Sequence, residues 1–392
     1  MTRFKSWTLT DVRGDVWQDA FSAGADALRL PTPFDWSIRK RTLRGGLRDG
    51  VDLIEVHNGA LSFSVLPTRG MGIWRGDYHG LPLGWRSPVQ GPVHPKFVHP
   101  SDRGGLGWLA GFDELLCRCG LASNGPPGQD GEGGLAQHTL HGRIANQPAD
   151  VVEVSVALDP PHELTVRGEV EEAALFCPHL RLTATYVTAP GSNRVVIHDI
   201  VENQSAQPAA MQILYHCNFG PPLLEAGGRV LAPVREVAPQ TPRAAEGIAS
   251  YETCAGPVAG FAEQVYLYDL LADSRGQTLA VLVNAAQDRA VAIRFNRKDL
   301  PCFTVWKNTG ALEDGYVTGL EPATNYPNFR GFERNQGRVP MLPPGGRWES
   351  RWSLEVADTA AAVSALLAEV ATLQAHARAV VHRQPHPRFS PT

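Results

Sequence analysis

The chain of 392 residues is long enough for about two to three average domains, and its 43% hydrophobic share can bury a large core. Lysine and arginine number 36 against 40 acidic residues, a formal charge of −4, which argues against a nucleic-acid or anionic-membrane partner. The six cysteines form no C-x-x-C pair and no apolar run is long enough to span a membrane. We therefore expect a soluble, cytoplasmic protein with reduced thiols and no bound metal.

Alternating apolar and polar residues predict an all-β fold from residue 51 onward. Residues 1–50 carry no clear pattern, and we expect them to lead into the main sheet. Strand-like stretches follow at 51–56, 61–65, 72–75, 151–158, 163–170, 180–187, 194–201, 211–216, 264–271, 279–284, 291–295, 302–306 and 348–356. Because no helical pattern separates them, these stretches predict an antiparallel sandwich or barrel.

Two segments depart from this pattern. Residues 86–139 are rich in glycine and proline, and we expect them to form a wall of a binding cleft, with a short helix at Asp113–Arg118 and a loop at Gly125–Gly134. Residues 359–381 predict an amphipathic helix that caps a sheet edge or makes a homodimer contact. The proline-rich tail from His382 is expected to be loose. The predicted organisation is a lead-in segment at 1–50, one large β domain at 51–357, and the helix and tail at 358–392.

The stretch from Gly319 to Arg330 is the strongest candidate for chemistry. It reads Gly-Leu-Glu-Pro-Ala-Thr-Asn-Tyr-Pro-Asn-Phe-Arg, which places Glu321 directly before a proline. Proline disfavours helix interiors and central strands, so we expect Glu321 where a strand gives way to a rigid loop. A carboxylate held in this way suits a general base, although a surface glutamate beside a turn is the plainer interpretation of this residue alone.

Two histidines stand beside chain-breaking residues in a similar way. His141 precedes a glycine in Leu-His-Gly-Arg, and His216 ends a predicted strand in Tyr-His-Cys-Asn-Phe-Gly-Pro-Pro, two residues before Asn218. Glycine lets the backbone approach a ligand closely. Taken alone, each is more often a structural histidine, and the order His141, His216, Glu321 carries more information than any one of them.

In the order and spacing of its motifs, the chain resembles the aldose 1-epimerases, or galactose mutarotase-like enzymes, in a bacterial branch of that superfamily. The resemblance covers about residues 50–356 and ends with the glutamate before a Pro/Asn turn. Its other motifs are Leu66-Pro67-Thr68-Arg69-Gly70-Met71, Cys119-Gly120-Leu121, Leu140-His141-Gly142-Arg143 and His216-Cys217-Asn218-Phe219-Gly220. It implies a β-supersandwich with a cleft that binds a monosaccharide or sugar derivative.

The resemblance also implies roles for individual residues. By analogy, Glu321 is the catalytic base, His216 is the general acid and His141 is a second histidine that holds the sugar. Glu263 is the carboxylate nearest to an aspartate that is typical of the family, and Trp74, Trp108 or Trp306 could stack on the sugar. The expected substrate-binding residues are His141, Arg143, Asn218, Lys307, Asn325, Arg69 and Glu263.

Anomer interconversion needs the two kinds of side chain found here. One proton leaves the C1 hydroxyl while another reaches the ring oxygen, the C1–O5 bond opens, and the ring recloses after rotation about C1–C2. A glutamate with a pKa of about 4.3 can accept the first proton, and a histidine with a pKa of about 6.5 can donate the second. We therefore expect an isomerase that needs no cofactor.

Other interpretations stay open from the sequence. A non-catalytic carbohydrate-binding or regulatory protein could keep the same cleft, and another sugar lyase or isomerase could share the fold. A mutarotase for a phosphorylated sugar would need several arginines to converge on the ligand. The candidates for that role are Arg69, Arg75, Arg103, Arg143, Arg330 and Arg334. The identity of the sugar and the oligomeric state are also open.

Overall fold

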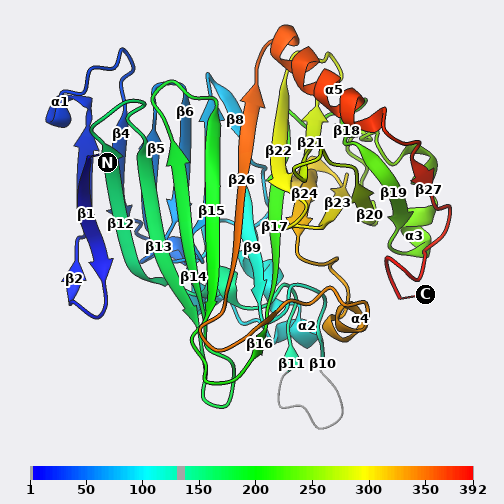
Figure 1. Ribbon diagram of the computed structural model, residues 1–392, viewed down its shortest axis with the longest axis horizontal. Coiled ribbons are helices and arrows are strands. Elements are labelled where there is room, and N and C mark those ends of the chain that lie inside the picture. Colours follow the sequence, from blue (N-terminus) through cyan, green and yellow to red (C-terminus); the bar gives the residue numbers. More distant parts are fainter. Residues whose placement is uncertain (1–2, 130–136, 392) are drawn as a thin grey trace.

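Two large sheets lie face to face in the computed structural model, which describes residues 3–129 and 137–391 (Figure 1). One sheet has ten strands and the other thirteen. A single longer helix near the C-terminus lies against the end of the ten-stranded sheet (Figure 1). This architecture confirms the expected all-β sandwich with a C-terminal helix.

The ten-stranded sheet combines strands from the start, the middle and the end of the chain. Its order is β18 (Arg229–Leu231), β21 (Gln277–Val283), β22 (Ala290–Asn296), β26 (Arg347–Ala357), β15 (Arg194–Asn203), β14 (Leu180–Thr188), β13 (Leu164–Glu172), β12 (Ala149–Ala157), β1 (Phe4–Asp11) and β2 (Val16–Trp17). The first fifty residues thus supply two strands at one end of this sheet.

The thirteen-stranded sheet carries the candidate catalytic residues. Its order is β27 (Val380–Val381), β19 (Val234–Pro239), β20 (Gln264–Leu270), β23 (Cys302–Asn308), β24 (Val317–Ala323), β17 (Gln212–Phe219), β9 (Leu116–Leu121), β7 (Gly72–Tyr78), β6 (Leu61–Leu66), β5 (Asp52–His57), β4 (Ser37–Thr42) and β3 (Ala20–Gly24), with β8 (Leu81–Leu83) paired to β7.

The remaining elements are short. Two small ribbons pair β10 (Gly128–Gln129) with β11 (Gln137–His138) and β16 (Ala209–Ala210) with β25 (Met341–Leu342). The short helices are α1 (Ala25–Leu28), α2 (Asp102–Gly105), α3 (Pro242–Ala245) and α4 (Arg330–Asn335). Single helical turns are η1 (Gly46–Arg48), η2 (Pro95–Phe97), η3 (Gly107–Gly111), η4 (Ile144–Asn146), η5 (Ile248–Ser250) and η6 (Leu312–Asp314). Residues 130–134 of the Gly125–Gly134 loop expected from the sequence lie outside the described residues.

Burial along the strands explains where a site can form. Strands β13 and β14 bury every second residue, as expected for strands with one face on the core and one toward solvent. Strands β17 and β24 instead bury every residue. Their outer face is covered by the long segment before β9, from which Trp108 and Phe112 pack onto Leu214 and Ala323. This confirms that residues 86–139 include a wall over the sheet.

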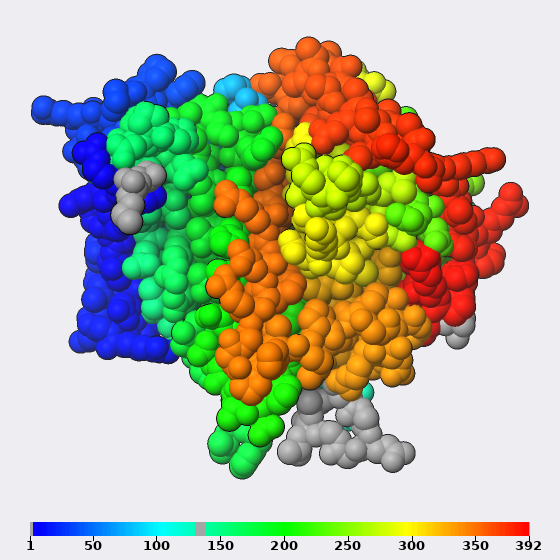
Figure 2. Space-filling model, in the orientation of Figure 1, coloured from blue at the N-terminus to red at the C-terminus, as the bar shows by residue number. Residues whose placement is uncertain are grey.

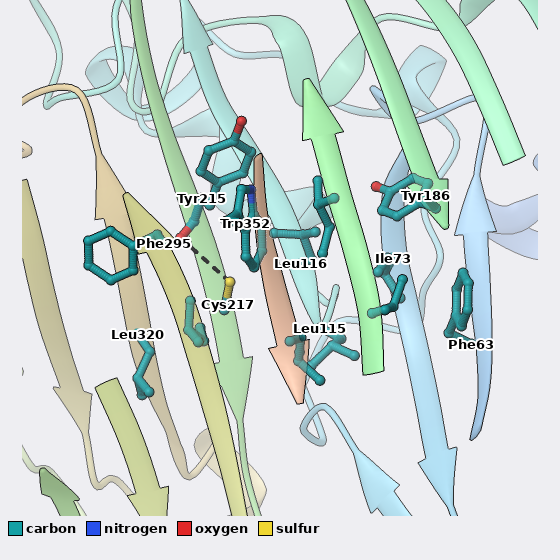
Figure 3. Packing of buried hydrophobic residues seen from close by; sticks show 14 of the residues in the cluster. Phe63, Ile73, Leu115, Leu116, Tyr186, Tyr215, Cys217, Phe295, Leu320 and Trp352 are labelled. Atoms are coloured by element: carbon teal, nitrogen blue, oxygen red, sulfur yellow. Dashed lines mark hydrogen bonds between the residues drawn. The ribbon is translucent and has the colours of Figure 1, made fainter. Parts of the chain in front are cut away.

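The interior between the sheets gives strands β9 and β17 a rigid backing. Large side chains such as Phe295 and Trp352 fill this interior (Figure 3). Among them Arg118 of β9 and Asp199 of β15 form a fully buried ion pair with Nε and Oδ2 2.6 Å apart, and the Tyr215 hydroxyl donates to the same carboxylate at 2.9 Å. Because a buried charge without a partner is costly, this network fixes β9 and β17 to the opposite sheet.

The expected helix at Asp113–Arg118 is wrong. The residues from Leu116 to Leu121 form strand β9, which pairs along its length with β17 in an antiparallel register. All six residues of β9 are buried, so pairing and burial override the local helical pattern.

The C-terminal region also differs from expectation. Helix α5 (Ala360–Gln374) ends before the predicted boundary, and residues 380–381 join the sheet as β27 beside β19. The helix packs on the outer face of β21 and β22 through a cluster that includes Val363, Leu366 and Leu279. Within the described ranges, no helix is both long and apolar enough to cross a membrane.

The tail after His382 is held in place, contrary to the expectation of a loose segment. Phe389 is fully buried beside Tyr326, with ring centroids 5.4 Å apart, and its carbonyl accepts a hydrogen bond from Asn328 at 2.7 Å. Arg388 also bonds to Asp269 of β20 at 2.7 Å. Figure 2 shows this C-terminal segment, in red, along the right-hand edge of the molecule. These contacts join residues far apart in sequence, which local composition does not reveal.

Candidate active site

His216 and Glu321 face each other across two central strands. Leu214 pairs with Ala323 and Cys217 pairs with Leu320, so the register sets His216 of β17 opposite Glu321 of β24. The His216 Nε2 and Glu321 Oε1 atoms lie 3.1 Å apart, and both side chains are almost fully buried. Although this distance is short, Oε1 has no partner in hydrogen-bond geometry among the described residues. The pair therefore has polar capacity left for a ligand.

Glu321 lies inside a central strand, which corrects the expectation that it ends one. Strand β24 pairs with β23 on one side and β17 on the other, and Pro322 belongs to it. Thr324 N–H donates to the Ile213 carbonyl at 3.0 Å, and the alternation of such bonds puts the next donor position at Pro322, opposite Tyr215. Proline has no N–H to offer there.

A thiol compensates for the donor that proline lacks. The Cys217 Sγ–H donates to the Tyr215 carbonyl at 3.8 Å, the bond drawn as a dashed line in Figure 3. The ladder of paired residues between β17 and β24 is thus interrupted at Tyr215–Pro322 and at the neighbouring pair, His216–Glu321. An otherwise unsatisfied buried carbonyl would be costly, and this bond allows a proline in a central strand.

Gly319 leaves room for the carboxylate. It lies two residues before Glu321 on the same face of β24, as strand alternation requires. A Cβ at position 319 would come within 2.4 Å of Glu321 Oε1 and 3.1 Å of the His216 ring. Because Gly319 has no side chain, the Glu321 carboxylate can occupy the space beside it.

Asn218 fixes the tautomer of His216. Its amide nitrogen donates to the carbonyls of Glu114, at 3.0 Å, and of His216, at 3.1 Å. Its Oδ1 is consequently the atom that faces His216 Nδ1, at 2.6 Å, and accepts a hydrogen bond from it. With the proton held on Nδ1, neutral His216 directs an unprotonated Nε2 toward Glu321.

His141 reaches the same place from a strained turn. Its φ is +58°, in the left-handed region that most residues avoid. The turn is anchored because the His141 carbonyl accepts from Gly120 N–H at 3.0 Å, and a Cβ on Gly142 would lie 2.3 Å from the Gly120 carbonyl oxygen. The ring lies 5.5 Å from the His216 ring between centroids. His141 Nδ1 is 2.9 Å from the Asn124 carbonyl oxygen, so Nδ1 carries the proton and Nε2 is the acceptor.

These three side chains share one cavity of about 420 Å³. Trp108, Phe112 and Trp306 supply aromatic walls around them. The Phe112 and Trp306 ring centroids lie 5.1 and 5.2 Å from that of His216. Glu263 stands at the opening, where its Oε2 accepts a hydrogen bond from the Trp306 indole N–H at 2.6 Å. A cavity of this size with a few convergent polar groups suits a small ligand.

Burial sets the charge state of the site. It raises the pKa of Glu321 well above the usual range of a carboxyl, and the negative charge of Glu263 adds to the effect. Burial also lowers the pKa of His216 to about 3, to which nearby His141 contributes and which the bond to Asn218 opposes. The pKa of His141 falls to about 4, again through burial. Both shifts favour an uncharged pair of Glu321 and His216 that holds one proton between the carboxyl and Nε2.

Asn218 and Asn325 lie behind the histidines and do not line the cavity. Asn218 supports His216 as described. Asn325 exchanges two hydrogen bonds with the Asn124 side chain, at 2.9 and 3.0 Å, and Asn124 carries the carbonyl that holds His141. Both amides thus orient a histidine in this structure.

The expected cationic residues lie elsewhere. Lys307 is on the other face of β23 from Trp306, where its Nζ donates to the Ser250 and Thr253 carbonyls at 3.2 and 2.8 Å. Burial lowers the pKa of Lys307 to about 8. Arg69 is buried in an ion pair with Glu114 at 2.5 Å.

Arg143 and Arg75 border two other hollows. Arg143 lines one of about 250 Å³, together with Glu172. Arg75 borders a larger, polar hollow of about 520 Å³ over β4 to β7. That hollow exceeds the site in size but contains none of His141, His216 and Glu321, so we place the chemistry in the smaller cavity. Within the described chain, no group of three or more His, Cys, Asp or Glu side chains is arranged to hold a metal ion.

Sequence reasoning missed several residues of the site. Gln240 lines the cavity from the end of β19, Leu106 and Leu109 line it from the segment before β9, and Leu140 lines it from the position before His141. No sequence pattern marks them, because they approach through loops. The role of Gly319 could have been predicted from the sequence, because residues two apart in a strand lie on the same face of the sheet.

Comparison with known proteins identifies the family of the chain. A protein family described as Domain of unknown function (DUF4432) matches residues 48–356 of the chain, which is most of its length. The chain belongs to this family. The DUF4432 chain is also similar, at 36% identity, to a protein from Klebsiella pneumoniae subsp. pneumoniae that is named as a candidate aldose 1-epimerase. Its crystal structure gives a TM-score of 0.94 over 98% of this chain and 99% of that chain.

More distant crystal structures share the fold of the DUF4432 chain. A galactose mutarotase-like protein from Clostridium acetobutylicum has 14% identity and a TM-score of 0.56, covering 82% of this chain and 98% of that chain. A candidate aldose 1-epimerase from Escherichia coli K12 has 15% identity and a TM-score of 0.52, covering 78% and 99%. These likenesses confirm the galactose mutarotase-like fold. No curated protein matches the sequence.

Proposed function

We propose that this protein is an aldose 1-epimerase-type isomerase that interconverts the anomers of a free sugar, with Glu321 and His216 as its acid–base pair. The observation that carries the proposal is the placement of these two side chains, 3.1 Å apart, in the wall of a cavity that also holds His141. Binding alone would not need a titratable acid and base in contact. Similarity to a protein named as a candidate aldose 1-epimerase supports the same chemistry.

The single proton of the pair is enough for a complete cycle. The proton first moves from Glu321 to Nε2 of His216, which gives a carboxylate and an imidazolium. Ring opening follows when the carboxylate takes the C1 hydroxyl proton and the imidazolium gives its Nε2 proton to the ring oxygen. The C1–O5 electron pair leaves with that oxygen, and a C1 carbonyl forms. The pair is then neutral, with the proton on Glu321, and ring closure after rotation about C1–C2 returns each proton. Because burial favours the neutral pair, the cavity favours the stage at which the sugar is open.

His141 positions the sugar in this proposal. Its Nε2 faces the cavity as an acceptor, since Nδ1 is committed to the Asn124 carbonyl. Trp108 and Trp306 offer flat apolar surfaces to the C–H groups of a sugar ring. These contacts hold the C1 end of the ring against the acid–base pair, and such orientation contributes to the rate along with proton transfer.

Exchange NMR on the anomeric protons of free aldoses tests the proposal. We expect the protein to accelerate exchange above the spontaneous rate for at least one sugar, and His216→Asn to lower that rate on the order of 10²-fold or more. The control is His376→Asn, which changes an exposed histidine outside the site and should leave the rate unchanged. A folded parent without acceleration on any aldose would refute the proposal, as would full activity in His216→Asn.

The pH dependence gives a second test. The pair gains a second proton only near the pKa of His216, about 3, and loses its last proton only above the raised pKa of Glu321. We therefore expect kcat/KM to stay level from pH 5 to 7 and to fall on the alkaline side. A steep loss between pH 7 and 5 would mean that the group in use is an unperturbed histidine.

A further inference from the structure

We propose that the cavity selects a neutral deoxyaldose, an aldose in which a hydroxyl away from C1 is replaced by hydrogen. This inference rests on the proposed function, because it concerns the ligand of the same cavity. It is carried by the chemistry of the lining beyond the acid–base pair, which is apolar on nearly every side.

Apolar side chains form the rim of the cavity. Leu106 and Leu109 are 38% and 40% exposed, and they stand beside Pro126, Pro127 and Leu140. Among the described residues that line the cavity there is no lysine, arginine, aspartate, asparagine, serine or threonine. Those residue types usually bind the several hydroxyls of a hexose. The rim therefore offers few polar side chains to a sugar hydroxyl that points toward it.

The remaining polar side chains are partly committed to the protein. The Gln240 amide nitrogen donates to the Pro327 carbonyl at 3.2 Å and to Asn328 Oδ1 at 3.3 Å. The Trp306 indole N–H donates to Glu263. The Gln240 and Trp306 donors of the wall already have acceptors, so a ligand hydroxyl gains little from them. The Trp108 indole N–H is the exception, since it is buried and has no acceptor among the described residues. A hydroxyl buried there would lose water without a replacement partner, whereas a methyl or methylene group would gain by leaving water.

Charge in the cavity favours a neutral ligand. Glu263 and Glu321 both line it, and no lysine or arginine does so within the described chain. A phosphate or a sugar carboxylate would meet these two acidic side chains without a cation to balance it. Discrimination against an added hydroxyl in an apolar pocket reaches about 10²-fold at most, which sets the size of the effect to look for.

Matched sugar pairs test the inference. The pairs are D-fucose with D-galactose, 2-deoxy-D-glucose with D-glucose, and 2-deoxy-D-ribose with D-ribose. Each catalysed kcat/KM from exchange NMR is divided by the spontaneous rate, because deoxy sugars open more readily in water. We expect the deoxy member to be preferred at least tenfold in one or more pairs. A smaller preference in every pair overturns the inference while leaving the proposed function in place.

Failure of the proposed function has a different signature. If no sugar is turned over, that function fails, and calorimetric titration of the same pairs still tests the choice of ligand by the same tenfold criterion. Leu109→Gln places an amide on the rim and should reduce the deoxy preference by about tenfold. The control is Leu47→Gln, at a residue 44% exposed and outside the cavity, which should change nothing. An unchanged preference in Leu109→Gln overturns the role of the rim.

Discussion

Replacing Glu321 by glutamine separates its chemistry from its contribution to stability. Glutamine keeps the volume and shape of the side chain but does not accept a proton as a carboxylate does. If Glu321 is the base, anomer exchange should fall on the order of 10²-fold or more while sugar binding persists. The double variant with His216→Asn should lose much less than the product of the two single losses, because acid and base act as a unit.

The effect on stability follows from the raised pKa of Glu321, which is only 2% exposed. In the unfolded chain the carboxyl has a pKa of about 4.3, so above that pH folding must take up a proton. Stability from this group is therefore fully present below about pH 4.3 and is lost as pH rises toward the folded pKa, at about 1.4 kcal/mol per pH unit. Glutamine takes up no proton. The variant should be more stable than the parent at pH 7 by roughly 1 kcal/mol or more, and this difference should vanish near pH 4.

Two measurements check this reasoning. Exchange NMR gives the rate, and urea unfolding at pH 5 and 7.5 gives the free energy of unfolding. Glu313→Gln, at an exposed glutamate outside the cavity, serves as the control. Full activity in folded Glu321→Gln would place the base elsewhere, with Glu263 next to be tested. A loss of more than about 1 kcal/mol at pH 7 would show that Glu321 is charged and paired in the folded protein.

Three further changes probe the surroundings of the pair. Gly319→Ala puts a Cβ 2.4 Å from the carboxylate and should lower kcat at least about tenfold without unfolding the protein, whereas Gly310→Ala, with no atom closer than 3.9 Å, should not. Asn218→Asp keeps the acceptor but adds charge, so NMR titration should show the His216 pKa rising from about 3, and no rise would contradict the contact. Phe389→Ala should cost about 3–5 kcal/mol in urea unfolding, and a cost below about 1 kcal/mol would show that the tail is not packed as described.

The sandwich was predictable because its signal is local. Alternation with a period of two marks each strand whatever its partner, and β13 and β14 follow it residue by residue. The same alternation placed His216 in a strand, although β17 continues past His216 to Phe219 and the expectation that His216 ends its strand was wrong. The strand that carries Glu321 was missed because we took Pro322 as the end of a strand, although its neighbours in sequence are compatible with one. Only the partner's register and the Cys217 thiol show how a central strand accommodates that proline.

The sequence predicted the meeting of His216 and Glu321 in one cavity better than it predicted the residues around them. Lys307 and Trp306 are neighbours on β23, so they point to opposite faces, and the register that brings Trp306 to the cavity turns Lys307 away. A sequence without strand register does not say which of two neighbours faces the ligand. The docked tail was hidden for a related reason, since Arg388 and Phe389 meet partners more than 50 residues distant.

Pro322 bears on how strand β24 finds its correct alignment. A shift of one residue against β17 would turn Glu321 toward the interior of the sandwich and separate it from His216. In the native alignment the Pro322 nitrogen, which has no N–H, lies opposite Tyr215. The Tyr215 carbonyl accepts a hydrogen bond from the Cys217 thiol instead. A shifted strand would set the proline against a carbonyl without such help, at a cost of about 1–3 kcal/mol. A residue that usually ends strands thus serves as an alignment mark, and a designer could use one proline in this way to bring two catalytic side chains into line.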